Sequence, residues 1–227
     1  MGGGGGSTAR EALKHKGLEK VVMRDIDEAS LAARMRACLP ANQEVFRDKK
    51  LHLIINDAKA ELENSIEKFD VIMGDLSDPV EGGPCNQHYT KCFYAQVVKP
   101  KLKDNCIFVT QAGPAGVLSH RKVFTSVNNT IKQVFKNVLT FTAHVPSYAE
   151  TWGWVMAADQ PFNLDPLHID NGIKERITGE LCYLDGACIL SSSIMNKFVY
   201  SSLLKETHVL TEENAKFIPG HRITYPA

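Results

Sequence analysis

Three acidic residues lie close together in the middle of the chain: Asp75, Asp78 and Glu81. They follow the apolar residues 69–73 directly, in a loop that is rich in Gly and Pro. Such an apolar run is typical of a strand buried on both faces, and open parallel sheets bind ligands outside the carboxyl ends of their strands. The spacing therefore predicts a carboxylate-lined crevice that suits a cationic substrate. The alternative is that Asp75 and Asp78 only cap the turn.

A second chemical signal stands near the start of the sequence, where five glycines, residues 2–6, precede Ser7 and Thr8. Either hydroxyl can cap a helix that continues through residues 9–12. Glycines that lead into a helix N-terminus let an adenosyl or dinucleotide ligand approach the backbone. Such a site also needs an acid at the end of a second strand, about 20 residues further on, and Asp25 takes that position. The alternative is a flexible linker.

The elements that must position these residues alternate between strand and helix. We expect strands at residues 21–25, 51–55, 69–73, 106–110, 138–144 and 152–156, and helices at residues 28–39, 58–67, 94–99, 121–136, 165–179 and 191–206. The alternation predicts an α/β fold with a doubly wound, mostly parallel sheet whose site lies along one rim. Asp57 follows the second strand, so another acid should reach this rim.

Length and charge limit the class of protein. A chain of 227 residues can bury one core, and we predict a Rossmann-like core over residues 1–160 with a helical extension, residues 161–227, packed on the same domain. Lys plus Arg and Asp plus Glu both number 26, which leaves no excess positive charge. This balance argues against a nucleic acid or a membrane surface as partner.

Cysteine, histidine and hydropathy patterns point to a cytoplasmic protein. The six cysteines form no Cys-x-x-Cys pair, and the eight histidines show no metal-ligand spacing, so we expect reduced thiols and no metal. No apolar run reaches the roughly 18 residues of a membrane span. We expect His88, Tyr89, Trp152 and Trp154 to pack in the interior or at the sheet edge rather than contact a substrate.

Four segments together resemble the spermidine/spermine synthase family of polyamine aminopropyltransferases. They are the glycine-rich residues 2–7, Asp-Ile-Asp at 25–27, Asn-Asp-Ala at 56–58, and residues 74–84. Residues 80–84, 110–116 and 143–147 are most similar to the plant-type thermospermine synthase branch. The resemblance covers nearly all of the chain and implies a Rossmann-like fold of the S-adenosylmethionine-dependent methyltransferase type. In this family a β-hairpin domain and the first strand precede the glycine loop; neither lies in this sequence, so we expect a fragment with unpaired strand edges and doubtful activity.

The resemblance also implies the chemistry. The family transfers an aminopropyl group from decarboxylated S-adenosylmethionine, a co-substrate, to an amine of a polyamine and releases methylthioadenosine. Because a protonated amine has no lone pair, a carboxylate must remove the proton and orient the nitrogen. The resemblance makes Asp75 this base and assigns polyamine binding to Asp78, Gln111 and Tyr148. It assigns donor binding to Gly3, Gly4, Gly5, Asp25, Asp57 and Ala58.

The implied partners are therefore a polyamine and the adenosyl donor, with homo-oligomers in full-length members of the family. Thermospermine is the favoured product, and spermine or spermidine are the others. One residue departs from the family, because Gly5 stands where an Asp or Glu normally holds the donor's ammonium group. Two alternatives follow: a catalytically impaired fragment or paralogue that binds ligands without turnover, and a small-molecule methyltransferase. A methyltransferase would not need the acid pair Asp75 and Asp78.

Overall fold

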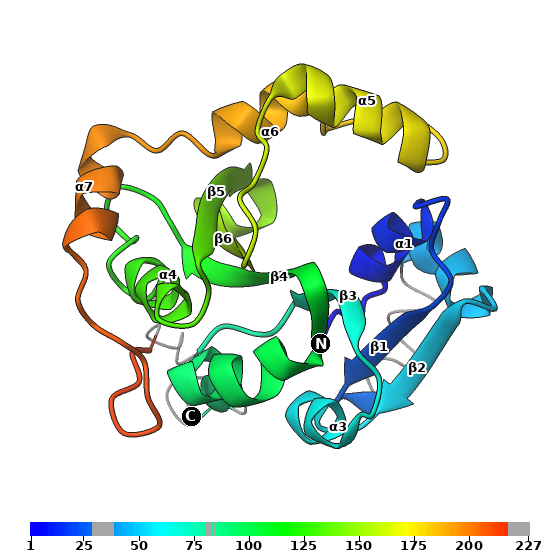
Figure 1. The fold of residues 1–227 in the computed structure, drawn as a ribbon, viewed down its shortest axis with the longest axis horizontal. Helices are drawn as coiled ribbons and strands as arrows, with labels where there is room; N and C mark the ends of the chain where they lie inside the picture. Colours follow the sequence, from blue (N-terminus) through cyan, green and yellow to red (C-terminus); the bar gives the residue numbers. More distant parts are fainter. Residues whose placement is uncertain (29–38, 80–82, 84, 218–227) are drawn as a thin grey trace, which may run out of the picture.

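The strands form two sheets in the computed structural model, which describes residues 1–28, 39–79, 83 and 85–217 (Figure 1). One sheet has two strands, β1 (Val21–Asp25) and β2 (Leu51–Ile55). The other has four strands in the order β3-β4-β6-β5, with bounds β3 (Phe69–Gly74), β4 (Leu102–Pro114), β5 (Asn137–Val145) and β6 (Glu150–Ala158). The pairs β1–β2 and β3–β4 are parallel, whereas β6 runs antiparallel to β4 and β5.

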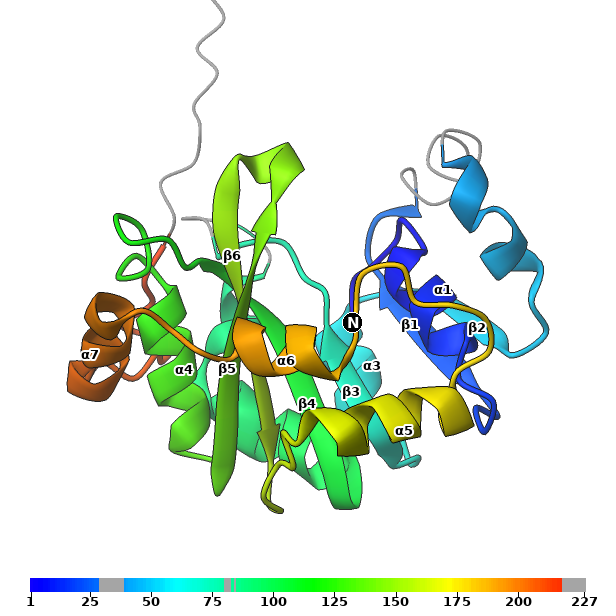
Figure 2. The same cartoon turned by 90° about the horizontal axis from the view of Figure 1, so that it is seen from above.

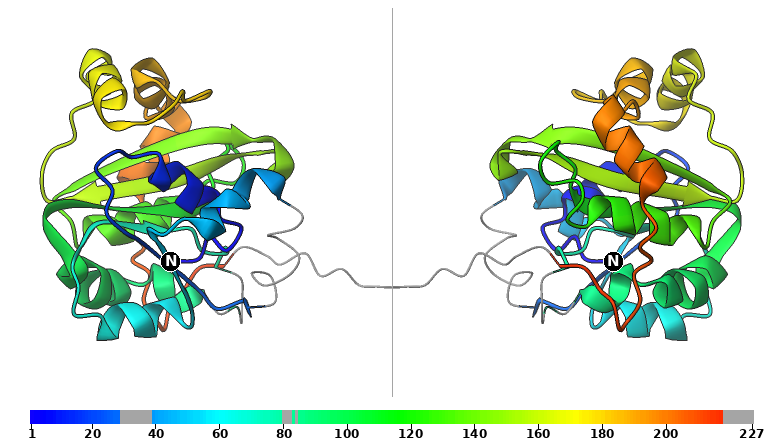
Figure 3. Two further views of the ribbon diagram at one scale, coloured as in Figure 1. Left: turned by 90° about the vertical axis from the view of Figure 1, so that its right-hand side faces the viewer. Right: turned by 90° about the vertical axis from the view of Figure 1, so that its left-hand side faces the viewer.

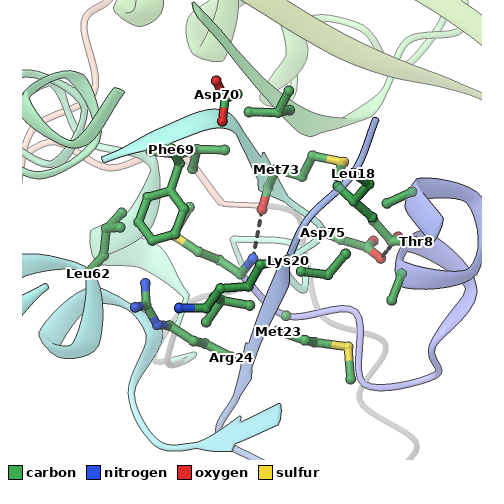
Figure 4. A pocket seen from close by; sticks show the side chains of 18 residues that line it. Thr8, Leu18, Lys20, Met23, Arg24, Leu62, Phe69, Asp70, Met73 and Asp75 are labelled. Carbon is green, nitrogen blue, oxygen red and sulfur yellow. Dashed lines mark hydrogen bonds between the residues drawn. The ribbon is translucent and has the colours of Figure 1, made fainter. Parts of the chain in front are cut away.

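Met1 and Gly2 join the two sheets at the carboxyl ends of β1 and β3. The Gly2 N–H donates to the carbonyl of Arg24 at 2.7 Å, and the carbonyl of Met1 accepts from the Asp75 N–H at 2.9 Å. Between the facing edges of β1 and β3 lies a cavity of about 190 Å³ (Figure 4). Most of the side chains around it are apolar, among them Leu62 and Phe69. The two sheets are therefore connected at one end and separated by this cavity along the rest of their edges.

Helices cover both faces of the larger sheet. The α-helices of the whole described part are α1 (Ser7–Leu13), α3 (Ala58–Asn64), α4 (Phe124–Lys132), α5 (Pro166–Arg176), α6 (Gly186–Ser192) and α7 (Lys197–Lys205). Six short 3₁₀ or π elements complete the described part: η2 (Pro40–Asn42), η3 (Glu44–Arg47), η4 (Asn86–Tyr89), the π-helix η5 (Phe93–Val98), η6 (Lys99–Lys101) and η7 (Pro146–Tyr148). Helix α4 packs on one face of β4, β5 and β6, while α5 and α6 lie over the other face (Figures 2 and 3). Helix α1 packs on β1 in the smaller half.

Two separate hydrophobic cores support the two halves. The larger core includes Phe108 and Phe124, both fully buried, and fills the space between the four-stranded sheet and α4. Gly153 permits this packing, because a Cβ there would lie 2.5 Å from the ring of Phe124. Within the described ranges the smaller core has three buried members, Ala9, Met23 and Val45. Burial of apolar area stabilises both halves, and it does so over far more surface in the larger one.

The predicted α/β fold and the positions of all six strands are confirmed. Four strands, β3, β4, β5 and β6, are longer than predicted. The largest differences are in β4, which reaches Pro114 because its end pairs with Trp152, and in β6, which begins at Glu150. The helices α3, α4 and α5 are shorter than predicted, and the helix expected at 94–99 is the π-helix η5 followed by a 3₁₀ turn. The helix expected at 28–39 lies almost entirely outside the described residues.

The prediction of one helix over residues 191–206 is wrong. Helix α6 ends at Ser192 and α7 starts at Lys197. The break arises because the side chain of Asn196 accepts a hydrogen bond from the Val199 N–H at 3.0 Å and caps a new helix. The division of the chain at residue 160 stays a prediction.

None of the helices within the ranges 1–28, 39–79 and 85–217 is long and apolar enough to cross a membrane. A cytoplasmic location stays a prediction.

Candidate active site

The glycine loop is bound to the acid at the end of β1. The Gly4 N–H donates to Oδ2 of Asp25 at 2.9 Å, across 21 positions of sequence. Gly3 and Gly6 adopt φ values of 78° and 81°, in the left-handed region that only glycine enters easily. An added Cβ at Gly6 would also lie 3.0 Å from the ring of Phe46. The structure therefore brings together the glycines and the acid that the sequence predicted to act together.

Asp75 stands at the end of β3, in contact with the same loop. Its Oδ2 accepts from Thr8 Oγ1 in the first turn of α1 at 2.5 Å (Figure 4). A Cβ on Gly3 would lie 3.1 Å from this oxygen, so the glycine loop passes directly beside the carboxylate. The residue is exposed, and no described residue donates to its Oδ1. Asp75 is thus held by one oxygen and presents the other, which can accept a proton.

Asp78 lies three residues further on and is half-buried. Its Oδ1 accepts from Nε2 of Gln111, on β4, at 3.0 Å. Burial raises the pKa of the Asp78 carboxyl, and the hydrogen bond from Gln111 opposes this increase. A cation that binds next to Asp78 would favour the charged carboxylate and offset part of its desolvation. Glu81, the third acid of the predicted crevice, lies outside the described residues.

Gln111 and Tyr148 meet through Trp152. The buried side chain of Gln111 accepts from the indole Nε1 of Trp152 at 3.0 Å. The ring of Tyr148, in η7, lies 4.7 Å from the Trp152 ring between centroids, and 59% of the Tyr148 side chain surface is exposed. The Trp152 ring therefore adjoins both Tyr148 and Gln111, and Gln111 itself contacts Asp78. The structure thus connects the three residues that the sequence assigned to the polyamine, while the proposed base Asp75 lies three positions before Asp78 and contacts Thr8.

Asp57 and Ala58 begin α3 at the end of β2. Oδ1 of Asp57 accepts from the N–H groups of Lys59 and Ala60 at 2.7 and 3.1 Å, so this acid caps the helix. The carboxyl ends of β1 and β2 are adjacent, because the Asn56 N–H donates to the carbonyl of Asp25 at 3.0 Å. Ala58 is buried. Asp57 therefore lies near Asp25 with its second oxygen available, on the side of the site assigned to the adenosyl donor.

Gly5 has room for a side chain. Its φ is outside the left-handed region, and among the described residues a Cβ there would have one neighbour within 4 Å, Leu39 Cδ1 at 3.7 Å. Its carbonyl accepts from Asn42 Nδ2 at 2.7 Å, which fixes the backbone. An acidic residue at this position would therefore cause neither backbone strain nor a clash with a described residue.

Sequence reasoning missed three residues of this site: Thr8, Tyr89 and Trp152. Tyr89 is buried, as predicted, but its hydroxyl also lies 2.6 Å from Nε2 of Gln111. Trp152 belongs to the sheet, as predicted, but its indole N–H binds Gln111 rather than only packing. Thr8 was considered only as a helix cap. The polar atoms of these side chains, such as the Tyr89 hydroxyl and the Trp152 indole N–H, are the feature of the sequence that could have indicated a role in the site. His88 packs as predicted, with its ring edge-on to Phe93.

Within the described residues no group of three or more His, Cys, Asp or Glu side chains could hold a metal ion. The charged groups of the candidate site are two acids near the glycine loop, Asp25 and Asp57, and two acids at and after the end of β3, Asp75 and Asp78. Cys85 lies between them, and burial together with the charges of Asp25 and Asp57 raises the pKa of its thiol.

The fold and this rim of carboxylates define an α/β protein with a Rossmann-like site at the carboxyl ends of its strands. Residues 1–166 match the Spermine/spermidine synthase domain. The chain therefore belongs to the spermine/spermidine synthase family.

Relatives of known activity agree with this family. The chain is 57% identical over 225 residues to thermospermine synthase ACAULIS5 of Arabidopsis thaliana, across 99% of this chain and 66% of that protein. It is 36% identical over 223 residues to the polyamine aminopropyltransferase of Sulfurisphaera tokodaii, across 97% of this chain and 72% of that protein. The chain thus spans about two thirds of the length of these relatives.

Solved structures share the fold. Spermidine synthase from Thermotoga maritima superposes with a TM-score of 0.76 at 24% identity, covering 89% of this chain and 66% of that one. A spermidine synthase in complex with the transition state analogue AdoDATO superposes with a TM-score of 0.79 at 24% identity, covering 89% and 67%. These two structures support the α/β architecture independently of the sequence motifs.

Proposed function

We propose that this chain transfers an aminopropyl group from decarboxylated S-adenosylmethionine to an amine of a polyamine and releases methylthioadenosine. The observation that carries the proposal is the contact between the two halves of the site. The Gly4 N–H binds Asp25 on one side of the glycine loop, and Gly3 lies against Asp75 on the other. An adenosyl donor on the loop would present its reactive carbon close to the acids at the end of β3.

The reaction needs one proton transfer and one displacement. Asp75, through its free Oδ1, takes a proton from the attacking ammonium group. The nitrogen lone pair then forms a C–N bond to the methylene carbon next to the sulfonium. The C–S bond breaks, and its electron pair returns to sulfur, which becomes a neutral thioether. Asp78 holds the amine by charge pairing, while Tyr148 and Gln111 line its path.

The donor is held by the other half of the site. Gly3, Gly4 and Gly5 let the adenosyl group approach the backbone. Asp25 accepts from the ribose hydroxyls, and Asp57 with Ala58 contacts the adenine edge. The positions of these residues at adjacent strand ends support this assignment.

Spermidine is the proposed acceptor and thermospermine the proposed product, in preference to spermine or spermidine as products. The 57% identity to the Arabidopsis thermospermine synthase supports this choice. Incubation with the donor and either putrescine or spermidine, followed by separation of spermidine, spermine and thermospermine, identifies the product. Turnover with putrescine alone would contradict the choice.

Asp75→Asn tests the proposed base. The variant should lose about 10²- to 10⁴-fold in turnover, because the amide cannot take the proton. Methylthioadenosine binding should persist, because the proposed adenosine contacts lie elsewhere. Asp70→Asn is the matched control, since Asp70 is an exposed residue of the same strand paired with Lys103. Full turnover in Asp75→Asn would refute the assignment.

Asp78→Asn separates binding from turn capping. We expect a larger loss for the polyamine than for methylthioadenosine, measured by calorimetry with each ligand. Equal losses for both ligands would show that Asp78 acts only as a cap.

Gly5 favours a second candidate, a protein that binds adenosyl ligand and polyamine without turnover. Without an acid at this position the donor's ammonium group lacks its partner in the glycine loop. Binding of both ligands in the absence of any product would support this candidate over the enzyme.

A further inference from the structure

The side-chain amide of Gln111 is bound at both ends. Its Oε1 accepts from the Gly113 N–H at 2.9 Å and from the Trp152 indole N–H at 3.0 Å. Its Nε2 donates to Oδ1 of Asp78 at 3.0 Å and to the carbonyl of Leu76 at 2.9 Å. The amide therefore links β6, which carries Trp152, to the loop that carries both proposed catalytic and binding acids.

These partners allow one orientation of the amide. Backbone and indole N–H groups only donate, whereas carbonyl and carboxylate oxygens only accept. The hydroxyl of Tyr89 donates to the carbonyl of Ser77 at 3.1 Å, so it faces Nε2 of Gln111 as an acceptor, and the two Nε2 hydrogens are shared among this hydroxyl, Leu76 and Asp78. A flip of the amide by 180° would set Oε1 against the Asp78 carboxylate and NH₂ against two donors. The flipped state would lose its hydrogen bonds and place an oxygen dipole beside a negative charge.

We propose that Trp152 is a positioning residue that fixes the Gln111 amide and, through it, directs the Asp78 carboxylate toward the cationic amine of the polyamine. This inference rests on the proposed function. Among the described residues Trp152 supplies the one side-chain donor to Oε1, since Gly113 donates from the backbone. The ring of Trp152 also adjoins Tyr148, so the residue joins the aromatic wall of the site to Asp78.

Two of the ionisable groups near Asp78, Tyr89 and Cys85, stay neutral around pH 7. Burial raises the pKa of the Tyr89 phenol well above its usual value, and the charge of Asp78 adds to this increase. Burial likewise raises the pKa of the Cys85 thiol, which also adjoins Tyr89. Asp75 is the second carboxyl of the loop and is bound to Thr8. Loss of the Gln111 donor removes a contact that opposes the raised pKa of Asp78, so Asp78 should protonate at a higher pH.

Trp152→Phe tests the proposal, with Trp154→Phe as the matched control. Trp154 lies two residues away on β6 and stacks on Phe141, with ring centroids 5.8 Å apart. It is the cross-strand partner of Gln111 through the backbone, but of the two indoles only that of Trp152 donates to the Gln111 side chain among the described hydrogen bonds. Trp152→Phe should raise KM for the polyamine about tenfold while leaving methylthioadenosine affinity unchanged, the loss expected for one buried hydrogen bond. The acid limb of the pH profile for kcat/KM should move to higher pH in this variant only.

The two tryptophans of the chain allow a readout that does not need turnover. In ¹⁵N-indole-labelled protein, Trp154→Phe identifies the Trp152 signal. We expect this signal to exchange slowly with solvent and to shift with the titration of Asp78 transmitted through Gln111, and we expect the shift to vanish in Asp78→Asn but persist in Asp75→Asn.

Gln111→Glu keeps the volume and the acceptor end of the side chain but replaces the donor end, so it should reproduce the KM increase even where Trp152→Phe fails to fold. Two results would refute the inference. One is a Trp152 indole chemical shift that does not change with the titration of Asp78, and the other is equal KM values and pH profiles for Trp152→Phe and Trp154→Phe. Loss of polyamine binding and turnover in the unsubstituted protein, with the indole signal still following Asp78, would refute the proposed function but leave the positioning role supported.

Discussion

The region proposed to bind the adenosyl donor (the donor side) and the region proposed to bind the polyamine (the acceptor side) are supported by hydrophobic cores of very different size. The donor side stands on β1, β2 and α1, around a core whose buried members among the described residues are Ala9, Met23 and Val45. The acceptor side stands on β3, β4, β6 and β5, around a core that contains most of the buried aromatic residues. Local stability follows buried apolar contact, so the donor side should open at a lower free energy than the acceptor side. The site therefore joins a weakly supported half to a strongly supported one.

Several contacts join the halves, including the hydrogen bonds from the Lys16 N–H to Arg176 and from the Thr178 N–H to Lys14, but those at the site itself are few and polar. Met1 and Gly2 bridge β1 and β3 through their backbone, and Thr8 binds Asp75. The geometry between donor and acceptor residues therefore depends on this joint more than on either core.

The largest effect should come from Phe108→Ala in the acceptor half. The ring of Phe108 lies 5.4 Å from that of Tyr94 and 6.1 Å from that of Phe135, so its removal leaves a cavity. We expect a loss of about 4 kcal/mol in the free energy of unfolding, measured with urea.

Met23→Ala, in the donor half, should instead reduce hydrogen-exchange protection mainly in β1 and β2. Equal loss of protection in β4 and β6 after Met23→Ala would show that the halves unfold together.

Asp25→Ala should affect only the donor side. The variant loses the acceptor of the Gly4 N–H and the proposed partner of the ribose, and hydrogen bonds to charged groups are worth about 1.5–3 kcal/mol. Methylthioadenosine affinity should fall roughly 10- to 100-fold in calorimetry, and polyamine affinity should stay constant. Asp70→Asn serves again as control. A matching fall in polyamine affinity would mean that the halves are coupled through the loop.

Glu206 makes the free energy of unfolding of the acceptor half depend on pH in the acid range. Burial opposes its ionisation, but hydrogen bonds from Thr125 and the His208 N–H, together with Lys216, outweigh this and lower the pKa from 4.5 to about 2. Because the folded-state pKa lies below the unfolded value, the stabilisation is present above pH 4.5 and is lost as the pH falls toward about 2. Glu206→Gln should cost about 1–2 kcal/mol at pH 7 and flatten the unfolding free energy across that window. An unchanged pH profile would contradict this account.

The smallest effect should be a gain from Gly5→Glu. The position has ordinary φ and open space, so the unfolding free energy should hardly change. The new carboxylate can pair with the donor's ammonium group, and we expect donor affinity to rise by roughly tenfold. Gly5→Gln is the control, because it has the same shape without the charge. Equal affinities for both variants would show that charge pairing is absent.

Much of the fold could be predicted because strands and glycines act locally. The apolar runs that form β1, β2 and β3 are short and bounded by polar residues, and their positions follow from this pattern. The contact between Gly4 and Asp25 could be predicted because the glycine loop has a known chemical requirement for an acid. The break between α6 and α7 could not, because apolar periodicity continues across it while the cap of Asn196 ends it.

The contacts of Gln111 were harder to predict for a physical reason. Its partners come from four segments, and Trp152 is 41 residues away in sequence. Side-chain hydrogen bonds of this kind depend on strand register, that is, on which residues of two strands lie opposite each other. The apolar pattern indicates which face of the sheet a side chain is on, but it does not determine the register. The family resemblance therefore assigned Gln111 to polyamine binding, but it did not identify Gln111 as the group that orients Asp78.

The cavity between β1 and β3 also makes the molecule sensitive to hydrostatic pressure. Pressure favours states of smaller volume, and unfolding removes internal voids. The space of about 190 Å³ lies at the boundary of the two sheets, partly open to solvent, rather than inside either core. Compression should therefore favour hydration of this boundary before that of either core and separate the donor half from the acceptor half while each keeps its own strand pairing.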